Sequence, residues 1–320
     1  LASSAASDVY KRQVLPSFNR ARLLPITIPT YFQEDVSEVI LVDDCSSDNT
    51  AEVVKELQTR FPTLRYFRNE VNSKQPYTQN VAISKVQSEY IYFGDDDSVL
   101  YPGSIRNLLN VMREKNADIV GGRALALFFP EQIDELDEFL SHYRNRIATE
   151  ANQIVDLSTL STNFTYTVKE PIKVPFCQAS CLCKTQVARE MQFDVKIEGN
   201  AYREETDFLI RATLAGYTIY YTSSANQINL PSAMCSGGAR SKNHRHWAEN
   251  AIRNNDYFID KNYDSMQKMF SLPRTKDEMK VLFRVQIKKQ VRQKHIMDFL
   301  ERIGSVSYTH LRAHETCADL

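Results

Sequence analysis

Asp95, Asp96 and Asp97 are consecutive carboxylates that follow an apolar, aromatic run at 90–94. The run predicts a buried strand, and the turn residues at 101–103 indicate that the chain leaves a sheet here. Crowded carboxylates repel one another, and burying an unpartnered charge is costly. A hard divalent cation offsets that cost, because Mg2+ and Mn2+ prefer oxygen ligands and are often shared with substrate phosphates. The alternative for this triplet alone is an acidic turn that stays solvated.

Polar clusters also end two other predicted strands, at 17–19 and at 43–46. In a parallel α/β sheet, ligands bind beyond the carboxyl ends of the strands. Three polar clusters at one such edge argue against three independent solvated turns. The sequence therefore predicts a ligand site at this edge.

The elements that must position these clusters alternate along the first part of the chain. Short apolar runs predict strands at 14–16, 38–42, 64–67, 90–93 and 119–120, and helical patterns lie between them at 21–33, 50–59, 80–86 and 104–115. This order predicts an α/β fold with a mainly parallel sheet flanked by helices. Farther along, helices are expected at 130–145, 204–214, 242–270 and 275–303, with a strand at 217–221.

Composition limits the class of protein. The chain has 320 residues, which is enough for one large domain or two smaller ones with a real core. Its formal net charge of −1 gives no field that points to nucleic acid as a partner. No stretch approaches the roughly 20 apolar residues that span a bilayer. Cys177, Cys181 and Cys183 lack the paired spacing of a zinc site, so we expect small buried apolar residues in a reducing cytosol.

Both ends differ from the rest of the chain. Residues 1–13 and 305–320 lack periodicity and are similar to translated sequencing-adapter sequence. The first segment has no apolar core of a signal peptide. We expect both to be non-native and the natural protein to be longer at one or both ends.

Four segments, in chain order over about 14–260, resemble motifs of the family 2 glycosyltransferases with the GT-A fold. Pro-Ser-Phe-Asn-Arg at 16–20 is similar to the family's Pro-Thr-Tyr-Asn-Arg, and 42–48 is similar to its Val-Asp-Asp-Gly-Ser-Thr-Asp. Residues 89–97 resemble the strand that ends in the D-x-D metal motif. Residues 203–211 resemble the acidic helix start that carries the catalytic base.

The resemblance implies a UDP- or GDP-linked sugar donor bound across the carboxyl edge of the sheet. Phe18 would stack on the base, and Asp44 would accept a hydrogen bond from a ring N–H. Arg240, in the loop 237–240, would clamp the diphosphate. The full set of implied donor contacts is Pro16, Ser17, Phe18, Asn19, Asp43, Asp44, Asp95, Asp96 and Arg240. The alternatives are a turn or capping role for Asp44 and a plain surface turn for the loop.

The resemblance also implies a metal ion and a catalytic base. Mn2+ or Mg2+ would be bound by Asp97, with Asp95 or Asp96 contributing through water or the ribose, and by a histidine, His244 or His246. The alternative for each histidine is a structural role.

Glu205 would be the general base that activates an acceptor hydroxyl, so that in-line attack inverts the anomeric carbon. The acceptor would be a glycan, a polysaccharide or a lipid-linked saccharide of the cell envelope. Glu204 and Asp207 are the substitutes, although a helix N-terminus favours acidic residues for dipole reasons alone.

Two departures from the family pattern bear on the donor site. Thr78-Gln79-Asn80 stands where the family has Ala-Arg-Asn, which removes an arginine that Lys74 could replace. Cys45 stands at the glycine of the Asp-Asp-Gly-Ser motif, which matters little if its backbone angle is ordinary.

These observations predict a domain at 14–260, with a nucleotide-binding half at 14–122 and an acceptor-binding half at 123–260, followed by C-terminal helices at 261–304. The helix 275–303 is basic and amphipathic. We expect it to pack on the domain; the alternative is peripheral contact with anionic lipid at the inner face of the cell membrane. Both readings agree with a cytoplasmic protein.

Three rival functions are disfavoured by the sequence. A sugar nucleotidyltransferase needs a glycine-rich loop after the first strand, and 17–22 contains no glycine. A receiver-type signalling domain fits neither the length nor the acidic cluster at 203–207. A nucleotide-sugar-binding protein without transfer activity is disfavoured by Asp97 and Glu205, because both catalytic positions carry carboxylates.

Overall fold

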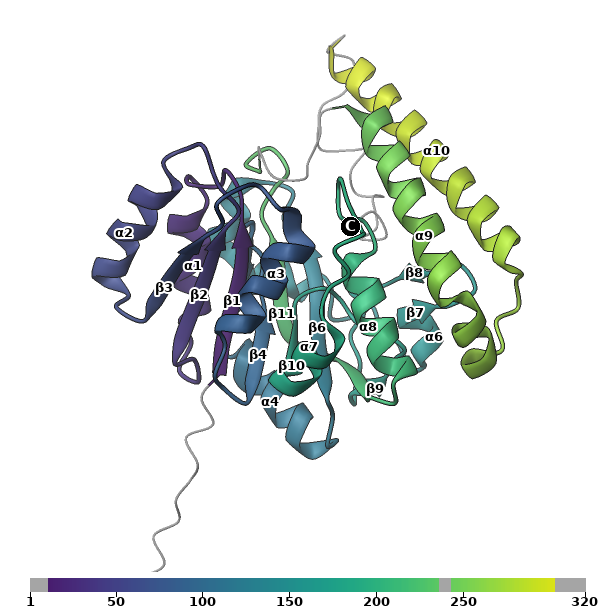
Figure 1. The fold of residues 1–320 in the computed structure, drawn as a ribbon, viewed down its shortest axis with the longest axis horizontal. Coiled ribbons are helices and arrows are strands. Elements are labelled where there is room, and N and C mark those ends of the chain that lie inside the picture. The colour runs from purple at the N-terminus through teal and green to yellow at the C-terminus, as the bar shows by residue number, and fades with distance from the viewer. Residues whose placement is uncertain (1–10, 236–242, 303–320) are drawn as a thin grey trace, which may run out of the picture.

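A nine-stranded sheet forms the centre of the molecule in the computed structural model, which describes residues 11–235 and 243–302. The strands follow the order β3-β2-β1-β4-β10-β6-β11-β5, with β9 paired to β11. Helices cover the sheet, and α9 and α10 lie side by side as a separate helical pair (Figure 1). The predicted α/β class with a helical C-terminal part is confirmed.

The elements keep the predicted alternation through β6. The strands are β1 Lys11–Ser17, β2 Glu38–Asp43, β3 Leu64–Arg68, β4 Tyr90–Phe93, β5 Ser98–Leu100, β6 Ile119–Ala126, β7 Val155–Asp156, β8 Ser161–Thr162, β9 Ile172–Lys173, β10 Cys181–Lys184 and β11 Ile219–Asn229. The helices are α1 Leu24–Tyr31, α2 Thr50–Arg60, α3 Lys74–Lys85, α4 Ser104–Glu114, the 3-10 helix η1 Pro130–Glu135, α5 Leu136–Ser141, α6 Ala151–Ile154, α7 Thr185–Met191, α8 Glu204–Leu214, α9 His244–Phe270 and α10 Lys276–Arg302.

The first four strands along this path are parallel, and their carboxyl ends share one edge. β1 pairs in parallel with β2 and with β4, and β2 pairs in parallel with β3. Ser17 lies opposite Asp43, and Val14 lies opposite Phe93. The predicted clusters after β1, β2 and β4 are therefore brought to the same place. β10 is antiparallel to both β4 and β6, and it joins this parallel half to the rest of the sheet.

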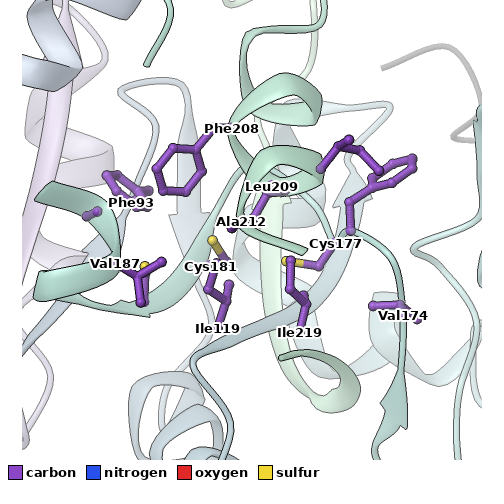
Figure 2. Close-up of a cluster of buried hydrophobic side chains, with 14 of the residues drawn as sticks. Phe93, Ile119, Val174, Cys177, Cys181, Val187, Phe208, Leu209, Ala212 and Ile219 are labelled. Carbon is purple, nitrogen blue, oxygen red and sulfur yellow. The ribbon is translucent and has the colours of Figure 1, made fainter. Parts of the chain in front are cut away.

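Each face of the sheet has its own core, because successive strand residues point to opposite faces. Val14 belongs to the cluster that includes Phe208 of α8, whereas Leu15 belongs to the cluster that includes Leu108 of α4. Figure 2 shows the first cluster, in which Cys177 and Cys181 lie among apolar side chains. Together with Cys183 they are buried, as the sequence predicts.

Several boundaries differ from expectation, among them those of α3 and β1. α3 begins at Lys74 rather than at 80, because Pro76 lies in its first turn, where a proline removes no helical hydrogen bond. β1 begins at Lys11 and so includes three residues of the segment 1–13.

The C-terminal helices pack on each other as expected. Phe283 and Ile287 of α10 are buried against Ala248 and Ala251 of α9. Within the described ranges, every helix is too short or too polar to cross a bilayer.

Candidate active site

A cavity of about 220 Å³ opens at the carboxyl edge of the parallel strands. Its walls come from the segments after β1, β2 and β4, from the start of α3, and from the turn before α8. The lining residues are Pro16, Ser17, Phe18, Arg20, Asp44, Asn72, Lys74, Gln75, Thr78, Asp96, Asp97, Gly199 and Ala201. Six predicted site residues thus line the same cavity: Pro16, Ser17, Phe18, Asp44, Asp96 and Asp97.

Helix α1 fixes the turn that carries the three aspartates. A Cβ on Gly94 would lie 2.8 Å from the Tyr31 ring, so the turn passes too close to α1 for any side chain there. The Tyr31 hydroxyl donates to the Asp95 carbonyl at 2.8 Å and accepts from the Asp95 N–H at 3.1 Å. Thr27 donates to the Asp96 carbonyl at 3.3 Å. The backbone of the turn is therefore held before any ligand binds.

The three aspartates do not point the same way. Asp95 Oδ2 accepts hydrogen bonds from Ser180 Oγ at 3.0 Å and from Gln227 Nε2 at 2.8 Å, so this side chain faces the second half of the sheet. Asp96 and Asp97 line the cavity instead. Asp96 and Asp97 are therefore the carboxylates at the cavity, whereas the Asp95 carboxylate is held by the second half of the sheet.

Arg20 lies against both cavity aspartates. Its Nε is 3.5 Å from Asp96 Oδ1, and its Nη2 is 3.4 Å from Asp97 Oδ2. The pKa of Asp96 is raised to about 7, mainly by burial and then by the Asp97 charge, while Arg20 acts in the opposite direction. Two crowded carboxylates offer the oxygen ligands that a hard divalent ion prefers.

The histidine predicted as a metal ligand belongs to the helical pair. The His244 ring lies 5.5 Å from the ring of His295 on α10. Among the described residues, no group of three or more His, Cys, Asp or Glu side chains is arranged to hold a metal. Asp96 and Asp97 are the two carboxylates that line the cavity. Arg240 lies outside the described residues.

Asp44 holds the loop before α3. Its Oδ1 accepts from Asn69 Nδ2 at 2.9 Å and from the Ser73 N–H at 2.8 Å, and its Oδ2 accepts from the Lys74 N–H at 2.8 Å. These bonds are the turn role that the sequence offers as the alternative for Asp44. It also places Lys74 and Thr78 on the cavity wall, where Lys74 supplies a cation.

Asn19 and Asp43, predicted to contact the donor, are instead committed to neighbouring loops. Asp43 is fully buried and accepts from Tyr66 Oη at 2.7 Å and from Arg68 Nη1 at 2.9 Å. Asn19 Oδ1 accepts from the Ser47 N–H at 2.7 Å. Neither residue lines the cavity, because their oxygens already hold the loop after β2.

Cys45, in that same loop, has a φ of 63°. This is the left-handed region, where glycine is favoured over any residue with a Cβ. The backbone angle of Cys45 is therefore not ordinary, so the replacement of the family's glycine at this position is not neutral.

Glu204 and Glu205 form a carboxyl pair at the start of α8. Glu204 is 1% exposed, and neither of its oxygens receives a hydrogen bond from a donor group of the described residues. Burial raises the pKa of Glu204 well above its ordinary value and raises that of Glu205 to about 7, and the Asp95 charge adds to both shifts. The Glu205 charge also raises the pKa of Glu204, whereas the interaction with Glu204 lowers the pKa of Glu205.

Asp207 has a structural role. It is fully buried, and its oxygens lie 2.7 Å from Arg211 Nε, 3.0 Å from Lys261 Nζ and 2.9 Å from Asn262 Nδ2. These contacts join α8 to α9. Both oxygens are engaged, so Asp207 is not placed to act as the base.

Sequence reasoning missed several residues of the cavity wall. Arg20 belongs to the motif at 16–20, and its position two residues after Phe18 is the one sequence feature that points to a place on the cavity wall. Asn72, Gln75, Gly199 and Ala201 carried no chemical signal, because only the folded loops bring them to the wall.

The mainly parallel sheet, the cavity at its carboxyl edge and the flanking helices are those of a GT-A fold. The family model described as glycosyl transferase family 2 matches residues 14–180, and the chain belongs to this family.

Known relatives are similar over part of this chain. The GalNAc(5)-diNAcBac-PP-undecaprenol beta-1,3-glucosyltransferase of Campylobacter jejuni is 32% identical over 111 residues, covering 34% of this chain and 36% of that protein. The match thus spans about a third of the length of the curated relatives. The Staphylococcus aureus TarS 1-349 structure with UDP-GlcNAc has a TM-score of 0.53 and 15% identity, covering 96% of this chain and 76% of that one. The Pyrobaculum calidifontis mannosyltransferase PcManGT, in complex with GDP-Man and Mn2+, has a TM-score of 0.52 and 15% identity, covering 79% and 64%.

Proposed function

We propose that this protein is a metal-dependent, inverting glycosyltransferase that moves a sugar from a nucleoside-diphosphate donor to an acceptor hydroxyl. The observation that carries the proposal is the placement of Asp96 and Asp97 on the wall of a 220 Å³ cavity at the carboxyl edge of the sheet. Asp95 connects this wall electrostatically to the carboxyl pair at the start of α8. Family membership supports the same reaction class.

The donor is a UDP- or GDP-linked sugar. Pro16, Ser17 and Phe18 supply the surface for the base, and Lys74 and Arg20 are the described cations that face a diphosphate. The similar structures with UDP-GlcNAc and with GDP-Man and Mn2+ support this ligand class.

Asp97 and Asp96 hold Mn2+ or Mg2+ in this proposal. The bound ion would neutralise charge that develops on the departing diphosphate. Arg20 keeps the two carboxylates in place and reduces their repulsion. Lys74 adds a second positive charge to the cavity lining, where the diphosphate would lie.

Glu205 takes the proton of the acceptor hydroxyl. A general base needs a pKa near the working pH, and burial places that of Glu205 at about 7. Glu204 keeps its own proton and donates to Glu205, which orients the base. Because attack and departure occur on opposite faces of the sugar, the anomeric configuration inverts.

The acceptor is a saccharide, a polysaccharide or a lipid-linked saccharide of cell-envelope synthesis, at the cytoplasmic side of the membrane. The name of the Campylobacter relative describes an undecaprenol-linked substrate, which supports this class. The rival function is a nucleotide-sugar binder without transfer, which would bind donor with Mn2+ and release no free sugar.

The test is calorimetric titration of UDP and GDP with and without Mn2+, together with release of UDP or GDP from UDP-GlcNAc, UDP-glucose and GDP-mannose. Asp97→Ala should weaken Mn2+-dependent nucleotide binding by at least about tenfold and abolish release. Asp134→Ala changes an exposed aspartate of η1 and serves as the control. Unchanged binding in Asp97→Ala would remove the metal assignment. Binding without release in the wild type, even with saccharide acceptors added, would favour the rival function.

A further inference from the structure

Arg203 lies directly before the carboxyl pair, as the residue that caps α8. Its φ is 75°, a left-handed angle that is strained for a residue with a Cβ. Such a conformation persists only where the surroundings over-determine it. The side chain is 9% exposed, so these surroundings are protein.

The guanidinium of Arg203 is enclosed by the C-terminal helices. Its carbon lies 5.4 Å from the ring centroid of Phe283 on α10, 6.0 Å from that of Phe258 on α9, and 5.1 Å from that of Tyr202. Its Nε donates to Asn255 Oδ1 of α9 at 3.1 Å, and its Nη1 donates to the Leu160 carbonyl at 3.3 Å. Aromatic faces and neutral oxygens thus hold this buried cation.

Further asparagines of α9 hold the loop that leads to Arg203. Asn254 donates to the Glu198 carbonyl at 2.7 Å. A Cβ on Gly199 would lie 2.7 Å from Asn250 Oδ1, so the loop passes α9 too closely for a side chain. Both asparagines are buried. Because Gly199 and Ala201 also line the cavity, α9 fixes both a cavity wall and the start of α8.

We infer that Arg203 is a positioning residue, through which the pair α9 and α10 fixes the start of α8 and so holds Glu205 in the geometry for catalysis. This inference rests on the proposed function, because it assigns Glu205 as the base. The helices α9 and α10 contribute most of the enclosure and carry no proposed catalytic group. Their function in this account is to orient a group on another helix, where a misplacement of about 1 Å can cost a hundredfold in rate.

The chain offers a matched control in Arg274. This residue also belongs to the C-terminal helical region and donates to a backbone carbonyl, that of Ser158, at 2.8 Å. It has no contact with α8 among the interactions of the described residues. Arg203→Met and Arg274→Met therefore remove the same group from the same region, but only the first loosens the start of α8.

The test measures release of UDP or GDP from UDP-GlcNAc, UDP-glucose and GDP-mannose with Mn2+ in the full chain, together with Kd for UDP and GDP and the melting temperature. For Arg203→Met, we expect kcat to fall by about 10- to 100-fold while Kd changes by less than about threefold. Arg203→Lys, which keeps the cation among the rings, should recover most of kcat, and Arg274→Met should keep it.

Four outcomes decide the inference. A folded Arg203→Met with wild-type kcat would overturn it, as would equal losses in Arg203→Met and Arg274→Met. If Arg203→Met does not fold, Phe283→Leu takes its place, because this change loosens the enclosure from α10 alone and should lower kcat without changing Kd. A Phe283→Leu with wild-type kcat would then overturn the inference. If the wild type releases no nucleotide from any donor, the proposed function fails first and the inference fails with it.

Discussion

The two acidic clusters, at the end of β4 and at the start of α8, look alike in sequence and differ in their surroundings. Each contains one carboxylate that is built into the framework: Asp95, held by Ser180 and Gln227, and Asp207, held by α9 and Arg211. Each also contains one carboxylate whose pKa is raised to about 7, Asp96 in the first and Glu205 in the second.

The difference lies in what faces the raised carboxylate. Arg20 faces Asp96 and Asp97, so the first cluster balances its charge with a cation. Glu205 has Glu204 beside it, a buried carboxyl group without another donor among the described residues. Burial raises the pKa of Glu204 well above its ordinary value, so we expect the second cluster to limit its charge by holding a proton. The first cluster, whose charge is balanced by a cation, is suited to bind a metal ion and a diphosphate. The second cluster, which retains a proton, is suited to proton transfer.

The largest effect is expected for Glu205→Gln. This change removes the proposed base and keeps the shape, so kcat for transfer should fall by about 10²- to 10⁴-fold. Kd for UDP or GDP with Mn2+ should stay close to wild type, because the first cluster is untouched. Steady-state kinetics and calorimetry measure both quantities, with the exposed Glu190→Gln as control. Full activity would move the base elsewhere and break the comparison.

Asp207→Asn should reduce stability instead of catalysis. The change removes the buried counter-charge of Arg211 and one of the two carboxylates that Lys261 contacts, so we expect the free energy of unfolding to fall by about 2–4 kcal/mol. Urea denaturation measures it. Asp260, which is 52% exposed and pairs with Lys276 and Lys280, offers the control: Asp260→Asn should cost less than about 1 kcal/mol. If Asp207→Asn stays stable but loses transfer, Asp207 acts as the base and Glu205 does not.

Glu204→Gln tests the retained proton through the pH dependence of stability. The folded-state pKa of Glu204 is raised, so its contribution is fully present below the unfolded pKa of about 4.3 and is lost as pH rises. The glutamine side chain of the variant does not titrate. Without metal, the variant should therefore gain at least about 1 kcal/mol over the wild type between pH 5 and pH 8. Urea denaturation at both pH values measures this gain, with the exposed Glu138→Gln as control. Equal pH dependence in variant and wild type would show that Glu204 holds no proton.

Much of the first cluster could be predicted from sequence, because its residues follow parallel strands. The run at 90–93 gave β4 its exact bounds, and strand ends on one edge brought Phe18, Asp44 and Asp97 to one cavity. The resemblance to the family 2 glycosyltransferases added an expected role for each residue, which the alternation of strands and helices alone does not supply.

The direction of individual carboxylates could not be predicted, since it depends on partners far along the chain. Asp95 turns away from the cavity because Ser180 and Gln227 donate to it across 85 and 132 residues of sequence. The enclosure of Arg203 depends in the same way on α9 and α10. Local patterns specify strands and helices, but contacts of this kind exist only once the second half of the sheet and the helical pair have packed.

The smallest effect is expected for Asp95→Asn, which tests whether the first cluster divides its roles as described. The donors to Asp95 are a neutral hydroxyl and a neutral amide, so the change should cost only about 1 kcal/mol of stability, less than Asp207→Asn. Mn2+-dependent nucleotide binding should be retained, unlike in Asp97→Ala. Removing the Asp95 charge also removes one cause of the raised pKa of Glu205. The acidic limb of the pH–rate profile should therefore shift to lower pH, because Glu205 ionises more readily. Loss of the Mn2+ dependence in Asp95→Asn would instead make Asp95 a direct ligand, and the first cluster would then have no framework carboxylate to set beside Asp207.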